Sequence, residues 1–323
     1  MIFPTKSQTP GRLLATLALL ALIGLAANAR PPGEERRDPV FRVNVDLVVL
    51  TFTVTDNKGK IVTGLKPEDL RVTEDGIPQK IVTFAEGAKT QLQFSSNPAV
   101  SLAGVNVFIL FDTSNSMYKG FAYASDAIAE FLRRLDQGDS VAVYTFSRNL
   151  SRVAALTKDH NQAIVGLRNA VAGDNTALYN TLLLTLRDAA REAGRKAVVV
   201  FSNGPDNASV IAPDDVRAVA EDEGIPIYVI STEEGRQDSI SAHVFQRLTA
   251  GTGGRLYWAR DWQKQAQAFA SVRDDIGSSY AAAYYPAPNS NEGFRKIKIE
   301  ILSDVEKKYR VRARPGYRSR SPL

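Results

Sequence analysis

Oxygen-bearing side chains gather in three short segments of the sequence. They are Asp112, Ser114 and Ser116 in the first segment, Thr176 in the second and Asn203 in the third. A loop that bends around a point aims alternate residues inward, so the first three side chains suit a common centre. Several hydroxyls with few carboxylates fit a hard cation such as Mg²⁺, which takes oxygen ligands and retains waters. Such a site leaves excess positive charge, which an acidic group of a partner neutralises without a nucleophile or general base.

The elements around these segments predict that they meet at one edge of a sheet. Two apolar runs, Val105–Phe111 and Ala197–Phe201, are typical of strands buried on both faces of a parallel sheet. Asp112 directly follows the first run and Asn203 follows the second, while Thr176 precedes a predicted helix. Ligands of doubly wound sheets bind at the carboxyl ends of the strands. We therefore expect the three segments to converge there.

Strands alternate with helices from Gly104 to Ile276. The first helix is marked by Ile128, Phe131, Leu132 and Leu135 at i, i+3, i+4 and i+7. Alternation of this kind indicates parallel βαβ units, hence an α/β fold with a doubly wound, mostly parallel sheet and helices on both faces.

The string FILFDTSNSM resembles the opening motif of von Willebrand factor type A domains, D-x-S-x-S at the end of the first strand. The family's metal-ion-dependent adhesion site adds a threonine, matched here by Thr176 in NTALYN, and an aspartate followed by glycine. Asn203 stands at that aspartate's position. The resemblance spans residues 104–276 and implies Mg²⁺ (or Mn²⁺ or Ca²⁺) bound by the hydroxyls. Asp112 and Asn203 would act through water, and the missing charge would weaken binding.

Both ends of the chain are predicted to be β-structure. Runs within residues 40–95 and 279–318 lack the crossover helices that parallel strands need, so we expect one β-sandwich built from both ends, with the α/β domain inserted. Asp75-Gly76 predicts a hairpin between the strands 69–74 and 79–85. A last strand is expected over Tyr309–Tyr317, where alternating arginines favour a solvated face. These flanks resemble a bacterial secreted subfamily with a type A-related domain.

The N-terminus has the pattern of a secretory signal peptide over residues 1–29. Lys6 and Arg12 precede an uncharged, largely apolar run of 14 residues, and Ala27-Asn28-Ala29 supplies a cleavage site. The apolar run is shorter than the roughly 20 residues that span a bilayer. A flexible leader is expected over 30–39. We therefore predict a secreted or periplasmic protein without a membrane span.

Composition narrows the function further. Cleavage would remove Lys6 and Arg12 and lower the net charge from +5 to +3. A net positive charge this small does not indicate nucleic-acid binding. The chain has no cysteine and only two histidines, which disfavours zinc enzymes and triad hydrolases. We predict a metal-dependent, adhesion-type module that binds a protein ligand and is not an enzyme. The alternative is a structural scaffold protein of the envelope with a degenerate, metal-free site.

Overall fold

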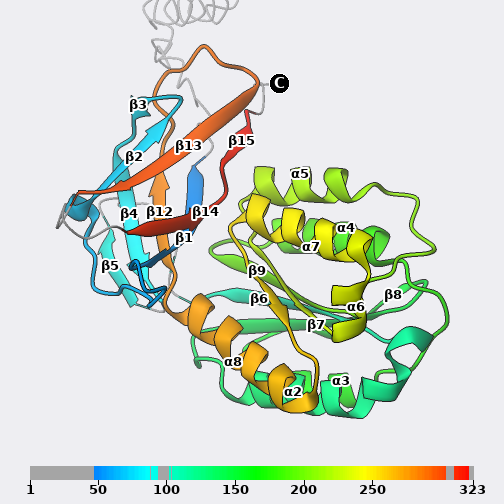
Figure 1. Cartoon of the computed structure of the whole chain (residues 1–323). Coiled ribbons are helices and arrows are strands. Elements are labelled where there is room, and N and C mark those ends of the chain that lie inside the picture. The colour runs from blue at the N-terminus through cyan, green and yellow to red at the C-terminus, as the bar shows by residue number, and fades with distance from the viewer. Residues whose placement is uncertain (1–46, 88, 94–101, 103, 303–308, 320–323) are drawn as a thin grey trace, which may run out of the picture. The chain divides into compact units, whose positions relative to one another are not determined.

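The computed structural model describes residues 47–87, 89–93, 102, 104–302 and 309–319 (Figure 1). The predicted signal peptide and leader lie outside these residues, as does the start of the first predicted β segment. No described helix is long and apolar enough to cross a membrane.

A six-stranded sheet forms the centre of the α/β region, in the order β11-β10-β9-β6-β7-β8. All neighbours pair in parallel except β7 and β8. The strands are β6 (Asn106–Asp112), β7 (Ser140–Phe146), β8 (Leu150–Thr157), β9 (Lys196–Phe201), β10 (Ile227–Ser231) and β11 (Leu256–Trp258). The chain leaves β6 toward β7 and later returns to β9 on its other side. The gap beyond the carboxyl ends of β6 and β9 is therefore the switch point where such folds bind ligands.

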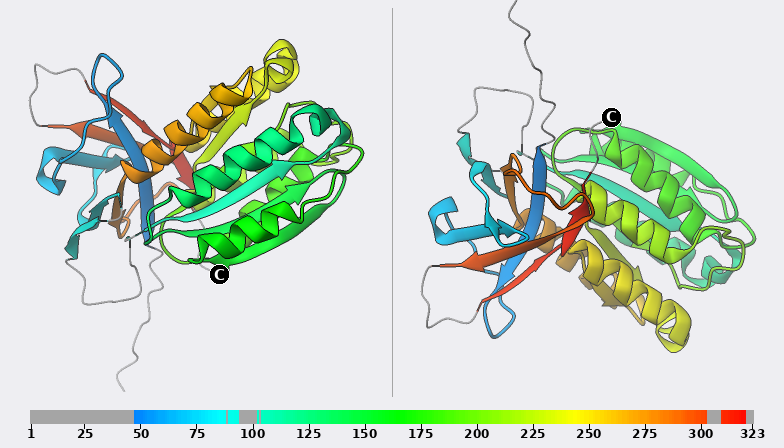
Figure 2. Two further views of the ribbon diagram at one scale, coloured as in Figure 1. Left: turned by 90° about the horizontal axis from the view of Figure 1, so that it is seen from below. Right: turned by 90° about the horizontal axis from the view of Figure 1, so that it is seen from above.

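Helices cover both faces of this sheet (Figure 2). One face packs against α2 (Phe121–Arg133), α3 (His160–Arg168) and α8 (Trp262–Gly277). The other packs against α4 (Leu178–Ala190), α5 (Pro213–Glu223) and α7 (Ser239–Thr252), and the short α6 (Glu233–Gln237) precedes α7.

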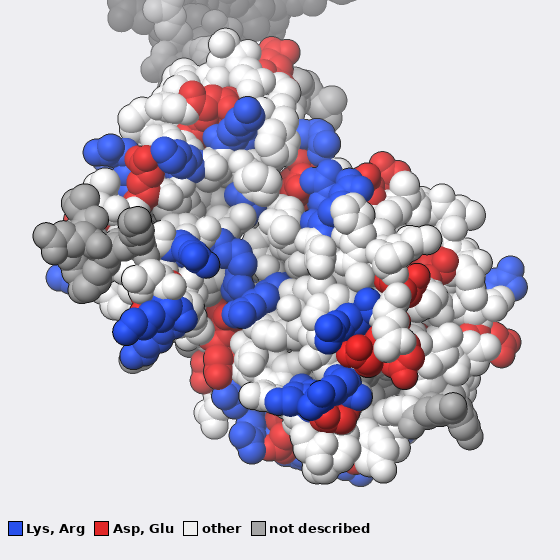
Figure 3. All heavy atoms as spheres, viewed as in Figure 1, with Lys and Arg blue, Asp and Glu red and all other residues white. Residues whose placement is uncertain are grey.

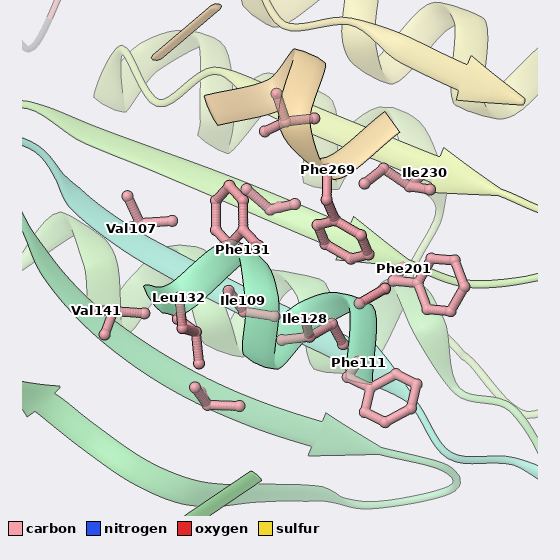
Figure 4. Close-up of a cluster of buried hydrophobic side chains, with 14 of the residues drawn as sticks. Val107, Ile109, Phe111, Ile128, Phe131, Leu132, Val141, Phe201, Ile230 and Phe269 are labelled. Atoms are coloured by element: carbon pink, nitrogen blue, oxygen red, sulfur yellow. The ribbon is translucent and has the colours of Figure 1, made fainter. Parts of the chain in front are cut away.

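Alternation along β6 divides its side chains between the two layers. Ile109 and Phe111 lie with Phe131 of α2 and Phe269 of α8, whose rings are 5.5 Å apart (Figure 4). Leu110 instead packs in the opposite cluster beneath α4. A strand buried on both faces is rigid, and it holds Asp112 at its end.

Two antiparallel sheets combine strands from both ends of the chain (Figure 1). One has the order β14-β1-β12-β4-β5 and the other β15-β13-β2-β3. The N-terminal elements are β1 (Val48–Thr55), η1 (Pro67–Asp69), β2 (Leu70–Glu74), β3 (Ile77–Pro78), β4 (Ile81–Glu86) and β5 (Lys89–Gln93). The C-terminal ones are β12 (Tyr280–Tyr284), β13 (Phe294–Ile301), β14 (Arg310–Ala313) and β15 (Gly316–Arg318).

The inner faces of these sheets share one apolar interior. Leu50 and Phe52 of β1 contribute to it from one sheet, and Val72 of β2 and Ile299 of β13 contribute from the other. The predicted fold class, a doubly wound α/β sheet with a β-sandwich made from both chain ends, is confirmed.

The predicted hairpin is only partly correct. Asp75 and Gly76 do form its turn, with φ values of 49° and 84° that match a type I′ turn. The strand that pairs with β2 is only Ile77–Pro78, however, and residues 81–86 pair with β12 in the other sheet. The pairing with β2 extends only one residue past Pro78, to the hydrogen bond that Gln79 N–H donates to the Val72 carbonyl at 2.9 Å, and the chain then changes sheets.

The last predicted strand is also divided between the sheets. β14 pairs with β1, whereas β15 pairs with β13, and Arg314-Pro315 separates them. Arg314 is only 6% exposed, and its guanidinium donates to the carbonyl oxygens of Glu221, Asp222 and Val49. A cation at the C-terminal end of α5 also complements the helix dipole. The expectation of a solvated arginine face is therefore wrong at Arg314.

Candidate metal site

The rigid end of β6 carries Asp112, whose side chain is fully buried. Its Oδ1 accepts a hydrogen bond from the backbone N–H of Ser114 at 2.9 Å. Its Oδ2 accepts one from the hydroxyl of Ser202, directly after β9, at 2.6 Å. The two neighbouring strand ends thus hold the carboxylate in a fixed orientation.

Burial raises the pKa of the Asp112 carboxyl above its ordinary value, since loss of water disfavours the charged form. The hydrogen bonds from Ser202 and Ser114 act in the opposite direction, and the negative charge of Asp206 adds to the rise. A bound cation would remove this penalty because it supplies the missing opposite charge.

Ser114 and Ser116 lie where β6 turns into the 3-10 helix η2 (Asn115–Gly120). The backbone N–H of Met117 donates to the Ser114 carbonyl at 2.9 Å and tightens this turn. Ser114 is buried, and its Oγ lies close enough to the Asp112 carboxyl to lower the pKa of that group, but it makes no hydrogen bond of normal geometry among the described residues. The Ser116 side chain is exposed, with only a long 3.4 Å hydrogen bond to Asn115.

Thr176 is buried just before α4, on the loop that follows α3. This loop is tied to the first segment, because Gly173 N–H donates to the Thr113 carbonyl at 2.8 Å and Asn115 N–H donates to the Asp174 carbonyl at 3.0 Å. Asn207 secures Thr176 by accepting from its N–H and donating to its carbonyl, both at 3.0 Å. The second and third loops are therefore joined as well.

Asn203 connects the third loop to the first through its amide. Its Nδ2 donates to the Ser116 carbonyl at 3.1 Å, while its Oδ1 is buried and without a hydrogen-bond partner in the described part of the chain. Gly204 follows with a φ of 113°, and a Cβ there would lie 2.7 Å from the Cβ of Ser241. Asn203 therefore needs glycine as its neighbour for both conformation and space.

Asp206 does not replace the carboxylate that Asn203 lacks. One of its oxygens accepts from Tyr179 N–H in the first turn of α4 at 3.0 Å. The other accepts from the N–H groups of Ala208 and Ser209. Its main role is thus to accept hydrogen bonds from free backbone N–H groups, one at the start of α4 and two in the turn that follows Asp206.

The family of this chain follows from comparison of the whole sequence. The family model described as von Willebrand factor type A domain matches residues 106–271. The chain belongs to the von Willebrand factor type A domain family. A curated protein of Borreliella burgdorferi, described as uncharacterized, is 25% identical over 228 residues. That alignment covers 65% of this chain and 66% of the relative, slightly less than two thirds of its length.

Three solved structures are among those that are similar to this chain. The conserved hypothetical protein BatB of Bacteroides thetaiotaomicron is 20% identical with a TM-score of 0.43, covering 53% of this chain and 100% of its own. The von Willebrand factor domain of the type V pilus tip protein of Porphyromonas gingivalis is 13% identical, with a TM-score of 0.47 and coverage of 55% and 96%. Proximal thread matrix protein 1 of the mussel byssus, with a zinc-occupied adhesion motif, is 13% identical, with a TM-score of 0.44 and coverage of 59% and 50%.

The donor set of this type A domain fits a hard cation. Within the described ranges, no group of three or more His, Cys, Asp or Glu has the arrangement of a metal site. The candidates are instead hydroxyl and amide oxygens around one carboxylate. Two of them, Ser114 Oγ and Asn203 Oδ1, are buried and without hydrogen-bond partners among the described residues. Oxygens of this kind are ligands that Mg²⁺ accepts.

Ser202 and Asn207 also belong to the site, although no motif of the sequence identifies them. Ser202 both donates to Asp112 and accepts from Gly204 N–H at 3.1 Å, so it links the turn of the third loop to the carboxylate. The only signal in the sequence is a hydroxyl directly after a buried strand. For Asn207 there is no such signal, because its partner Thr176 is 31 residues away.

Proposed function

We propose that this chain is an exported protein-binding module of the type A family, with a divalent cation between its three loops. The cation is Mg²⁺, with Mn²⁺ or Ca²⁺ as substitutes. Ser114, Ser116 and Thr176 would supply hydroxyl ligands, and Asp112 and Asn203 would hold coordinated water. When bound, the cation supplies a positive centre that attracts a carboxylate of the protein partner. This role is binding and requires no catalytic group.

The orphaned oxygens of Ser114 and Asn203 carry this proposal. A buried polar atom without a hydrogen bond costs about 1 to 3 kcal/mol. Two such atoms beside one buried carboxylate are best explained by a cation and its waters. The missing charge at Asn203 leaves Asp112 as the main neutralising group, so an acidic partner is favoured.

The alternative role, a scaffold protein of the envelope with a metal-free site, is favoured by a different observation. Asp112 already accepts two hydrogen bonds, and the Asn203 amide already joins the first and third loops. These contacts close the loops without a cation. The two roles differ in whether the purified chain binds metal.

Calorimetric titration with Mg²⁺ distinguishes them. We expect the wild-type chain to bind, Asp112→Ala to lose binding, and Ser114→Ala to bind more weakly because it lacks one ligand. Ser151→Ala, an exposed serine at the start of β8, is the matched control and should bind like wild type. A wild-type chain that shows no heat of binding, while Asn203→Asp does, would establish the metal-free alternative.

Export and partner choice are tested separately. N-terminal sequencing of the exported protein should begin near Arg30, and intact Met1 in the membrane fraction would contradict cleavage.

Figure 3 shows one face on which basic and acidic side chains are interspersed, which supports a protein partner over nucleic acid. A pull-down from envelope extract with and without chelator should recover the partner only in the presence of metal.

A further inference from the structure

Asn203 is followed by Gly204, and the two form the only Asn-Gly pair in the sequence. The side-chain amide carbon of an asparagine, Cγ, is open to attack by the backbone nitrogen of the next residue, which closes a five-membered succinimide ring. Glycine favours this reaction because it has no side chain to obstruct the approach of its nitrogen. The pair lies in the third loop of the candidate metal site, outside the helices and strands.

The attacking nitrogen has a hydrogen-bond acceptor in place for the proton that it must lose. Gly204 N–H donates to the Ser202 hydroxyl oxygen at 3.1 Å. The same hydroxyl donates to Asp112 Oδ2 at 2.6 Å, so its orientation is fixed and its oxygen stays directed at the Gly204 amide. An oriented acceptor of this kind assists the removal of a proton.

The side-chain amide of Asn203 is held at only one of its two ends. Its Nδ2 donates to the Ser116 carbonyl at 3.1 Å, whereas its Oδ1 makes no hydrogen bond with any described residue. The oxygen therefore loses no contact when Cγ becomes tetrahedral during the attack. The Ser116 side chain, next to the leaving nitrogen, is exposed, which gives ammonia a way out and water a way in.

The backbone carbonyl of Asn203 is covered, unlike its side-chain carbonyl. Gly235 of α6 packs against it so closely that a Cβ on that glycine would lie only 2.9 Å from the carbonyl carbon. When water opens a succinimide ring, attack at the backbone carbon gives isoaspartate and attack at Cγ gives aspartate. The position of Gly235 therefore favours aspartate as the product.

We propose that Asn203 is a self-modifying residue, which deamidates in the folded chain and leaves mainly an aspartate at its position. In the first step the Gly204 nitrogen loses its proton and bonds to Cγ, the Cγ–Nδ2 bond breaks, and Nδ2 takes up a proton and leaves as ammonia. In the second step water adds to Cγ, the bond from Cγ to the Gly204 nitrogen breaks, and this nitrogen regains a proton. One water is consumed, one ammonia is released, and no oxidant or reductant is needed.

The product carries the carboxylate whose absence weakens the candidate cation site. The conversion adds one negative charge to the third loop and removes the Nδ2 group that donates to the Ser116 carbonyl. This consequence rests on the proposed function, under which the cation site is weak in fresh protein and strengthens with age. The deamidation itself does not need the cation, so the two proposals can fail separately.

Peptide mapping by mass spectrometry tests the reaction. The fresh full chain is incubated with chelator at neutral pH in water enriched in heavy oxygen, and samples are digested at intervals. We expect the peptide with Asn203 to gain the mass of an amide-to-acid conversion with one heavy oxygen atom. Peptides with Asn115 and Asn289, each followed by serine, should stay unchanged. An aspartate-specific protease, which does not cleave at isoaspartate, distinguishes the two products.

The same incubation in urea separates the effect of the fold from the reactivity of the Asn-Gly pair. The unfolded chain should give a much larger share of isoaspartate, because both ring carbonyls are then open to water. Ser202→Ala should slow the folded chain about tenfold or more, because the acceptor for the proton is lost, and should not change the rate in urea. Ser151→Ala is the matched control and should leave both rates unchanged.

Three results would overturn the self-modification. They are an Asn203 that stays intact in the folded chain while it deamidates in urea, a folded chain that gives mainly isoaspartate, and a Ser202→Ala variant that reacts at the wild-type rate. Calorimetry of fresh and aged chain then tests the consequence, with an expected rise in Mg²⁺ affinity of about five- to thirty-fold. If the aged chain carries the aspartate but neither sample binds Mg²⁺, the self-modification stands and the proposed metal function fails.

Discussion

Replacement of Asn203 by Asp restores the charge that this chain lacks and removes the amide that it uses instead. The Nδ2 group donates to the Ser116 carbonyl, and a carboxylate offers only acceptors in its place. Loss of this hydrogen bond costs about 0.5 to 1.5 kcal/mol. The new charge also repels the Asp112 carboxylate, by on the order of 1 kcal/mol for like charges in a partly wetted site. We therefore expect metal-free Asn203→Asp to be about 1 to 3 kcal/mol less stable than wild type.

The affinity of Asn203→Asp for Mg²⁺ should rise, although its metal-free stability falls. An added negative charge near a cation favours binding by on the order of 1 to 2 kcal/mol, or about five- to thirty-fold in affinity. Saturating Mg²⁺ should therefore restore much of the stability that the variant loses, because ligand binding stabilises the folded state by an amount that grows with the logarithm of its affinity. The same substitution thus separates the structural role of Asn203 from its role near the cation.

The assay is urea unfolding with chelator and with saturating Mg²⁺, combined with calorimetric titration. Asn115→Asp is the matched control, because it adds the same charge on the first loop at an exposed position. It should change both quantities much less than Asn203→Asp does. Equal effects of the two variants would refute the specific placement of Asn203, and unchanged stability and affinity in Asn203→Asp would refute the amide contact itself.

Three further predictions concern stability. Burial raises the pKa of Asp112, so at pH values above 3.8, its pKa in the unfolded chain, the ionised carboxylate destabilises the metal-free fold. In urea unfolding with chelator, Asp112→Asn should therefore be more stable than wild type at pH 7. This difference in stability should shrink toward pH 4. Arg314→Met should lower the free energy of unfolding by about 2 to 4 kcal/mol, since buried carbonyls such as that of Glu221 lose their donor, whereas the exposed Arg310→Met should change it little. The excised segment 104–276 should unfold cooperatively on its own, because both apolar clusters of the α/β region lie within it; a gradual loss of its circular dichroism on heating would contradict this.

Arginine side chains join the α/β region to the β-sandwich within the described chain. Arg195, just before β9, donates to the carbonyls of Gly87 and Ser279 and to the Ser279 hydroxyl, and burial lowers its pKa to about 10. Arg312 of β14 donates to Asp275 of α8 at 2.7 Å. The contact of Arg312 and those of Arg314 explain why these two arginines do not join the exposed Arg310 in a solvated face.

Local patterns were sufficient to predict the fold class, and they are the basis for the predicted ligands, which stay a prediction. Apolar runs such as Val105–Phe111 identify buried parallel strands because every side chain on them meets a helical layer. The D-x-S-x-S motif places Asp112, Ser114 and Ser116 at a strand end because strand and turn are both local in sequence. Asp75-Gly76 likewise predicts its turn from the backbone freedom of two residues.

Contacts between distant residues were decided only by the tertiary structure. The hairpin after β2 is short, and only the packing of the two sheets determines that the chain then pairs with β12. The sequence shows that Asn203 lacks a charge, whereas the fold directs its amide to Ser116, 87 residues away. The hydrogen-bond partner of a buried polar group depends on which distant part of the backbone packs against it. The pattern of residue types along the chain does not contain that information.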